Sequence, residues 1–239
     1  MKLIDIHSHI LPGLDDGSSN MEQSLRMLEI AYKEGISTIV ATPHNMPGKG
    51  CPDREVVEQK CRQLQEKAIS VNIPITILMG TEYFYREEVL ELLEQGEGIT
   101  LAGTDRVLIE FDPGTEKTYI RNAVREILAL GYVPVIAHVE RYMHLMEKHF
   151  EAIIEMRKMG ALIQVNAGSV TGDNGWKTKQ AVKALLKRKA IDLIGTDAHS
   201  DGRRSPKMKE CGEYLHKKLD VEYAEYLLHA SALGLVSNR

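Results

Sequence analysis

The sequence predicts an α/β protein in which parallel strands, each followed by a helix, close into a barrel. Short β-branched runs alternate with longer amphipathic stretches, which is typical of repeated strand–helix units. The length of 239 residues and a hydrophobic content of 43% suit one such barrel, so we expect a single domain over residues 1–239. Residues capable of chemistry follow nearly every strand, and a barrel gathers strand ends on one face. The alternative, an open doubly wound sheet, would concentrate them at one switch point.

Seven short apolar segments, rich in β-branched residues, have the composition of strands in a parallel sheet. The predicted strands cover residues 3–6, 38–41, 75–79, 107–111, 133–137, 162–165 and 192–195.

The stretches between these strands have the periodicity of amphipathic helices. Ser19 is the predicted N-cap of the first helix, and Glu22, three residues later, would complete a capping box. Gly35, Gly131 and Gly160 lie where helices are expected to end. The predicted helices cover residues 21–33, 54–71, 119–130, 150–159, 177–187 and 221–230.

Composition narrows the classes of function. The net charge of −4 gives no broadly basic surface, so we expect no nucleic-acid partner. His7 and His9 interrupt the first apolar segment, which argues against a secretory signal, and no apolar run approaches the ~20 residues that span a bilayer. Three scattered cysteines indicate a reducing compartment rather than a disulfide framework. The sequence therefore predicts a cytoplasmic protein without membrane insertion.

Six of the seven predicted strands deliver histidine, aspartate or glutamate at or just beyond their carboxyl ends. The first ends in HSH, and His7 and His9 can face one ion because residues two apart in a strand point to the same side. A single ion takes about four to six ligands, so nine candidates predict two or three ions. Mixed nitrogen and oxygen ligands without thiolate favour manganese, iron or zinc over calcium or magnesium. The candidate ligands are His7, His9, Asp16, His44, Glu82, Glu110, His138, Asp197 and His199.

Such a site suits the hydrolysis of phosphoesters. Clustered divalent ions lower the pKa of a bound water and clamp the attacking and leaving oxygens of a displacement. A phosphate group also needs counter-charge from the protein, and guanidinium groups match its oxygens bidentately. Arg141 follows the fifth strand, and Arg203 and Arg204 follow the seventh, so these arginines are the candidates for phosphate binding.

The motifs at the strand ends resemble those of the PHP superfamily, named for polymerase and histidinol phosphatase domains. A closer resemblance, to the capsule-type bacterial tyrosine phosphatases of this superfamily, covers nearly the whole chain. The superfamily motifs are similar to residues 7–9 (HSH), 42–44 (TPH), 137–138 (AH) and 196–199 (TDAH). The closer resemblance is carried by residues 5–17 (DIHSHILPGLDDG), 41–44 (ATPH), 80–82 (GTE), 108–111 (LIEF), 137–142 (AHVERY) and 164–169 (QVNAGS).

This resemblance implies a distorted (β/α)7 barrel of the PHP fold, to which the seven predicted strands correspond. It implies hydrolysis of phosphotyrosine that favours Mn2+, with Fe, Zn, Co or Mg as alternatives. The implied protein substrate is an autophosphorylating bacterial tyrosine kinase that controls the synthesis of capsular or exported polysaccharide. Neither the oligomeric state nor the physiological metal follows from the resemblance.

The resemblance also implies how the ligands are shared. One ion would take His7, His9 and Asp197, with Glu82 as a bridge to a second ion. The remaining ligands of that second ion would be Glu110 and His138, and a third ion would take Asp16, His44 and His199. Arg141 and Arg204 match the phosphate-binding arginines of the family. Because Arg203 is adjacent to Arg204, the choice between them stays open, and Thr196 stands where the family usually has serine.

Cysteine-dependent phosphatase chemistry is excluded by spacing. That chemistry needs an arginine six positions after the cysteine to lower the thiol pKa, and Val57, Lys67 and Lys217 occupy those positions here. Two other interpretations remain. A small-molecule phosphatase of the histidinol-phosphate type would use the same ions, whereas a non-catalytic PHP scaffold module predicts the loss of ligands, yet all nine are present.

Overall fold

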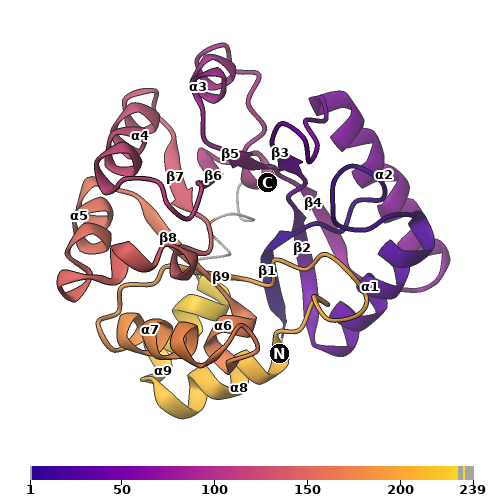
Figure 1. Ribbon diagram of the computed structural model, residues 1–239. Helices are drawn as coiled ribbons and strands as arrows, with labels where there is room; N and C mark the ends of the chain where they lie inside the picture. Colours follow the sequence, from indigo (N-terminus) through magenta and orange to yellow (C-terminus); the bar gives the residue numbers. More distant parts are fainter. Residues whose placement is uncertain (1, 231–233, 235–239) are drawn as a thin grey trace.

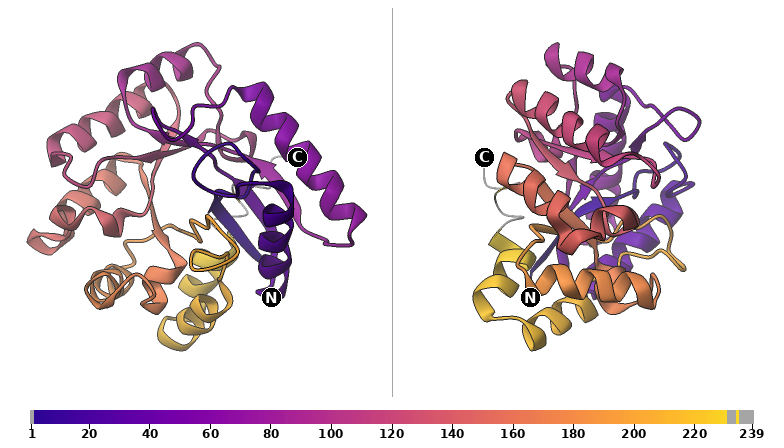
Figure 2. Two further views of the ribbon diagram at one scale, coloured as in Figure 1. Left: turned by 45° about the vertical axis from the view of Figure 1, so that its right-hand side comes forward. Right: turned by 60° about the vertical axis from the view of Figure 1, so that its left-hand side comes forward.

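The computed structural model describes residues 2–230 and 234, so parts of both ends of the predicted domain, residues 1, 231–233 and 235–239, lie outside the described residues. Strands lie at the centre and helices form a ring around them (Figure 1). The two side views in Figure 2 likewise place the helices outside the strands. The predicted α/β class is confirmed, with a curled parallel sheet.

All seven predicted strands are present, with ends shifted by a few residues at most. The structure adds two short strands, β3 and β5, each of which follows a predicted strand after a two-residue interruption. The strands are β1 (Leu3–Ser8), β2 (Ile36–Ala41), β3 (His44–Asn45), β4 (Thr76–Met79), β5 (Glu82–Phe84), β6 (Arg106–Glu110), β7 (Val133–Ile136), β8 (Leu162–Asn166) and β9 (Leu193–Gly195).

Every pairing between the strands β1 to β9 is parallel, as the sequence predicts. One sheet has the order β1-β2-β4, and the other has the order β3-β5-β6-β7-β8-β9. The interruption between β2 and β3 contains Pro43, which has no N–H group to donate to a neighbouring strand. A parallel bridge between Ser8 and Ala198 brings the end of β1 beside the segment that follows β9. The carboxyl ends of strands that are distant in sequence therefore lie together.

Helices follow the strands and cover the outside of the curled sheet (Figure 1). Each predicted helix is present, and the structure adds α3, α6 and α8 to them. The final predicted helix is α9, which continues as a π-helical turn over Tyr226–Ala230. The helices are α1 (Met21–Lys33), α2 (Arg54–Ser70), α3 (Glu87–Glu94), α4 (Lys117–Ala129), α5 (Glu151–Met159), α6 (Ala167–Thr171), α7 (Trp176–Lys187), α8 (Lys209–Lys218) and α9 (Val221–Glu225).

The predicted cap of α1 was wrong by one residue. Asn20, not Ser19, is the N-cap, and its side chain accepts a hydrogen bond from the backbone N–H of Gln23. Gln23 in turn accepts from the N–H and the hydroxyl of Ser19, at 2.8 Å each. Asparagine and serine are comparably good caps, so the sequence had no strong reason to prefer one over the other. Gly35, Gly131 and Gly160 do have positive φ where helices end, as predicted.

The interior of the curled sheet is apolar at one end and polar at the other. A small buried cluster contains Val40, Leu78 and Leu108, from three different strands. The candidate ligands His44, Glu82 and Glu110 lie two to four residues beyond these three apolar residues in the sequence. Leu108 and Glu110 both lie on β6, where alternate residues point to the same face. His44 and Glu82 lie on the short strands β3 and β5, which follow β2 and β4 and pair with each other.

Candidate metal centre

The nine candidate ligands converge on one small volume, centred on the buried carboxylate of Glu82. Glu82 Oε1 lies 2.8 Å from His138 Nε2 and 3.3 Å from His7 Nε2. Its other oxygen, Oε2, lies 3.2 Å from His9 Nε2 and 3.1 Å from His44 Nδ1. One carboxylate therefore contacts four imidazoles, an arrangement suited to a bridge between ions.

The remaining four candidates, Asp16, Glu110, Asp197 and His199, contact one another or the histidines around Glu82. Asp16 Oδ1 lies 3.4 Å from the imidazole Nε2 of His199, and Asp16 is the only one of the nine with a largely exposed side chain, at 45%. Glu110 Oε1 lies 3.0 Å from His44 Nδ1. Asp197 Oδ1 lies 3.5 Å from His199 Nδ1. The structure thus brings together every residue that the sequence selected as a ligand.

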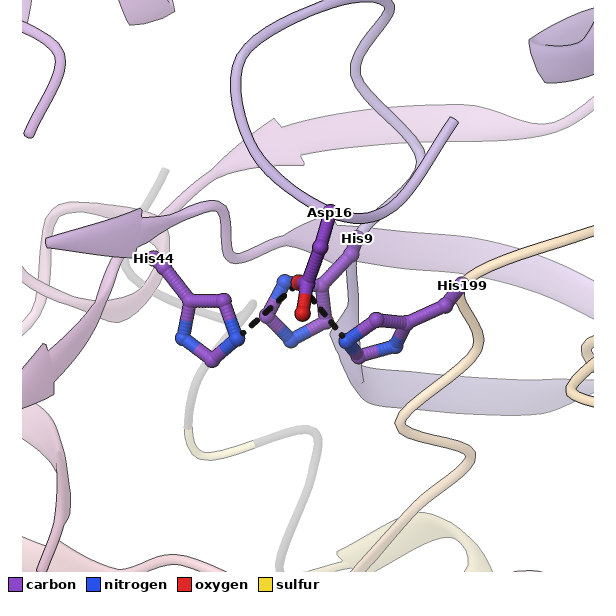
Figure 3. A group of neighbouring side chains, drawn as sticks. All are labelled: His9, Asp16, His44 and His199. Carbon is purple, nitrogen blue, oxygen red and sulfur yellow. Dashed lines mark ion pairs between the residues drawn. The ribbon is translucent and has the colours of Figure 1, made fainter. Parts of the chain in front are cut away.

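Ligand atoms in this cluster form three overlapping groups, each compact enough for one ion. One group consists of His9, Asp16, His44 and His199, whose imidazoles and carboxylate point toward one another from strand β3 and from the segments that follow β1 and β9 (Figure 3). The donor atoms of this group lie within 4.8 Å of one another. The other groups are His7, His9 and Glu82, and His44, Glu82 and Glu110.

Buried ligand atoms that lack a hydrogen-bond partner indicate that the cluster fits metal ions. Glu82 Oε2, Glu110 Oε1 and His44 Nδ1 are buried and have no hydrogen-bond partner, although His44 Nδ1 lies 3.1 Å from Glu82 Oε2 and 3.0 Å from Glu110 Oε1. Burying a polar atom without a hydrogen bond is costly. A metal ion bound between these three atoms would supply the missing partner. Five imidazoles and four carboxylates without a thiolate form a donor set for manganese, iron or zinc.

Strand β8 supplies no candidate ligand, but it holds three of the ligands in place. The side-chain oxygen of Gln164 accepts a hydrogen bond from the backbone N–H of His138 at 2.6 Å and lies 3.3 Å from His7 Nδ1. Gln164 Nε2 donates to Asn166 Oδ1 at 3.0 Å, and Asn166 Nδ2 donates to Asp197 Oδ2 at 2.9 Å. Partners of this kind fix the tautomer and orientation of a ligand.

Asp15 holds two ligands in the same way. Its Oδ2 lies 2.7 Å from His9 Nδ1 and accepts the backbone N–H of His44 at 2.9 Å. Burial alone would raise the pKa of Asp15, but the hydrogen bond and charge of His9 outweigh burial and lower this pKa to about 2. Asp15 is therefore a carboxylate that leaves His9 Nε2 free to face the centre.

Protons compete with metal ions for these histidines. Burial would lower the pKa of His9, but the hydrogen bond to Asp15 and the negative charges of Asp15 and Glu82 outweigh burial and raise it to about 10. The pKa of His44 is raised to about 9, against the effect of burial, by Glu110 and Glu82. Since a metal ion binds neutral imidazole, an ion entering the cluster must displace these protons.

Two of the ligands have a backbone conformation that is rare for residues other than glycine. His138 and Asp197 have φ values of 33° and 54°, in a region that side chains other than glycine seldom adopt. Next to Asp197, Gly195 leaves no room for a side chain, because a Cβ there would lie 2.6 Å from His7 Cβ. The strained turns after β7 and β9 thereby direct their ligands back over the sheet.

The predicted phosphate-binding arginines both reach the cluster. The guanidinium of Arg141 contacts Asp197 Oδ2, and burial, which lowers the pKa of Arg141, is outweighed by nearby carboxylates that raise it. Arg204 NH2 lies 2.9 Å from Asp197 Oδ1 and donates to the backbone oxygen of Asp197 at 3.2 Å. Arg203 lines the adjoining cavity together with Arg141 and Arg204.

The sequence analysis missed the supporting residues Asp15, Gln164 and Asn166. It considered only ligand-type residues at strand ends, so an amide-bearing strand was set aside. A usable signal was present, because Gln164 and Asn166 are polar residues two apart in an otherwise apolar strand, and alternate positions face the same way. Asp15 precedes Asp16 directly, and only the fold shows which of the two turns toward His9.

Comparisons with known proteins agree with this geometry. Residues 3–237 match the family model described as "Capsular polysaccharide synthesis, CpsB/CapC". The tyrosine-protein phosphatase CpsB of Streptococcus pneumoniae is 33% identical over 230 residues, which cover 94% of each chain. The tyrosine-protein phosphatase YwqE of Bacillus subtilis (strain 168) is 32% identical and covers 99% of this chain and 92% of its own.

Solved structures give the same relationship. A structure from work on YwqE of Bacillus subtilis and CpsB of Streptococcus pneumoniae, described as unique metal-dependent tyrosine phosphatases, has a TM-score of 0.92. It is 32% identical and covers 99% of this chain and 95% of its own. An organophosphorus hydrolase from Deinococcus radiodurans, at 13% identity and a TM-score of 0.62, shares the fold alone. The family match spans nearly the whole chain, and the chain therefore belongs to the CpsB/CapC family of capsular polysaccharide synthesis.

Proposed function

We propose that this chain is a metal-dependent protein-tyrosine phosphatase. The observation that carries the proposal is the convergence of five histidines and four carboxylates around Glu82, which fits a cluster of divalent ions. Relatives that are named tyrosine-protein phosphatases align with this chain over at least 93% of its length. In the part of the chain that the structure describes, the cysteines Cys61 and Cys211 are buried and Cys51 is exposed, and none carries the spacing of a thiol phosphatase.

The ligands would serve three ions, with manganese the metal that we favour. His7, His9 and Asp197 would hold one ion, and Glu82 would bridge it to an ion held by Glu110 and His138. A third ion would be held by Asp16, His44 and His199. These three residues belong to the group of Figure 3, whose fourth member, His9, is a ligand of the first ion. Oxygen and imidazole donors without sulfur support manganese, iron, zinc or cobalt, and make magnesium a weaker alternative.

When bound, such ions would activate water for attack on phosphorus and neutralise charge on the phosphate. The chain itself would bind the phosphate oxygens through Arg141 and Arg204, whose planar guanidinium groups donate two parallel hydrogen bonds. Both arginines already lie against Asp197, at the edge of the ligand cluster. The leaving group, a tyrosine phenolate with a conjugate-acid pKa near ~10, needs little help from a general acid.

Three further properties are part of the proposal. We propose the PHP-type (β/α)7 barrel as the fold of a single domain, and a cytoplasmic location. An autophosphorylated bacterial tyrosine kinase that controls capsular polysaccharide synthesis is our proposed substrate. Within the described residues, no helix combines the length and apolar character needed to cross a bilayer. The family description, which names capsular polysaccharide synthesis, supports this choice of substrate.

The test is a metal-dependence profile on a phosphotyrosine peptide. After chelation, we expect turnover to be lost and then restored by added Mn2+, and His44→Ala to lower turnover by at least tenfold. Histidinol phosphate serves as the competing substrate. Turnover that survives chelation, or a preference for histidinol phosphate over the peptide, would contradict the proposal. Gln65→Met, far from the cluster on α2, is the control for changes that affect only stability.

A further inference from the structure

Two cavities adjoin the ligand cluster and share the walls formed by Arg141 and Pro113. The larger one, of about 1000 Å3, has a charged lining that includes Arg203, Arg204 and Lys207. The smaller one, of about 530 Å3, lies on the other side of Arg141. A substrate whose phosphate binds at the cluster could extend into either cavity, and their linings decide which.

The smaller cavity joins the cluster directly. Glu110 and His138, both candidate ligands, form part of its wall together with Arg141. The rest of the lining is largely apolar and includes the side chains of Phe84, Phe111, Met46, Pro47 and Pro113. In the larger cavity, the apolar lining side chains are those of Pro113 and Met143. An aromatic ring attached to a bound phosphate is therefore better accommodated in the smaller cavity.

The wall behind the smaller cavity is rigid. Phe111 is 4% exposed and packs against Tyr85 and Tyr142, with ring centroids 5.4 and 6.2 Å away. The hydroxyl of Tyr142 accepts the backbone N–H of Phe111 at 3.0 Å. Phe84 is only half-buried, so part of its ring is available to a ligand.

The rim of the cavity is also held in place. Arg86 donates to the backbone oxygen of Asn45 at 3.0 Å and to its side-chain oxygen at 2.8 Å, which ties β3 to the end of β5. The loop that carries Met46 is closed by a 2.7 Å hydrogen bond from its N–H to the backbone oxygen of Gly50. Lys49 of this loop forms a 3.3 Å ion pair with Asp16. A preformed cavity binds its ligand without the cost of ordering loops.

We propose that this smaller cavity is the subsite for the aryl group of the substrate, and that Phe84 and Met46 select aromatic over aliphatic phosphomonoesters. The inference rests on the proposed function, because it places the phosphate at the ligand cluster. The ring would stack on Phe84, and the thioether of Met46 would contact the ring. A phosphoserine side chain has no ring and would leave these surfaces without a partner.

The experiment uses phosphonates, which are not hydrolysed. Calorimetry on the manganese-loaded full chain compares phenylphosphonate, which carries the ring, with methylphosphonate, which does not. We expect the wild type to prefer phenylphosphonate, and Phe84→Ala to reduce this preference about three- to tenfold, the size of one lost aromatic contact. Phe84→Leu should restore part of the preference, and Met46→Ala should lower it independently.

The control variant is Met143→Ala in the larger cavity, which we expect to leave the preference unchanged. Unaltered binding of methylphosphonate and unaltered manganese content show that each variant retains its ligand cluster. Loss of the preference in Met143→Ala, or its full retention in Phe84→Ala and Met46→Ala, would overturn the proposal. Failure of the proposed function looks different, because the wild type would then not hydrolyse a phosphotyrosine peptide, whereas the ring preference is measured by binding.

Discussion

Gln164 offers the sharpest test of how the ligand cluster is built. Its side chain is fully buried, and its single oxygen serves both the N–H of His138 and the ring of His7. We consider Gln164→Met, which keeps the approximate volume and removes both polar groups. The variant removes the partner of the backbone N–H of His138 and the donor to Asn166 Oδ1.

The expected magnitude follows from these contacts. Each lost hydrogen bond costs about 1 kcal/mol, and a buried donor left unpaired costs about 1–3 kcal/mol. The free energy of unfolding should therefore fall by about 2–4 kcal/mol if the contributions add. Because two ligands lose their orientation, we also expect the affinity for manganese to fall about 10–100-fold, as is usual for residues that hold ligands.

The assay is a titration of the chelated protein with manganese, followed by calorimetry and by metal analysis after desalting. Gln65→Met is the matched control, since Gln65 also bridges two backbone groups, the oxygen of Ile75 and the N–H of Ile77. It lies on α2, away from the cluster, so it should lose stability and keep its manganese affinity. Equal manganese affinity in Gln164→Met and the wild type would refute the reasoning.

Three further predictions concern the arginines, the protons and the tight turn. Arg141→Lys should lower kcat/KM about 10–100-fold at constant metal content, because a lysine cannot bind phosphate bidentately; unchanged kinetics would exclude this role. Manganese binding at pH 7 should release protons, since the raised pKa values of His9 and His44 keep both charged there, and affinity should rise as pH approaches about 9. Calorimetry in buffers of different protonation enthalpy measures this release, and its absence would contradict the assignment. Gly195→Ala should cost about 1–3 kcal/mol of stability and lower the metal content by displacing His7, and a variant with normal melting and metal content would count against it.

Much of the fold and of the ligand set was determined by the sequence itself. Apolar segments of strand length predict the seven strands because burial on both faces leaves little choice of composition. His7 and His9 share a side because strand periodicity is local, and that alone joins two ligands. Histidine, aspartate and glutamate also follow the other strands directly. Because parallel strands have their carboxyl ends at the same edge, these residues are predicted to lie close together. Predictions were confirmed where the composition or the side-chain alternation of one short segment was enough to make them.

Tertiary structure decided everything that depends on partners distant in the chain. Helices α3, α6 and α8 are short or weakly apolar, so their formation depends on packing against the rest of the molecule. The central position of Glu82 could not be read from its own segment, because it arises from four imidazoles on three other segments. Likewise, Gln164 and Asn166 are ordinary amides until folding brings His7 and Asp197 beside them. A local pattern specifies which way a side chain points, and only the assembled sheet specifies what it meets there.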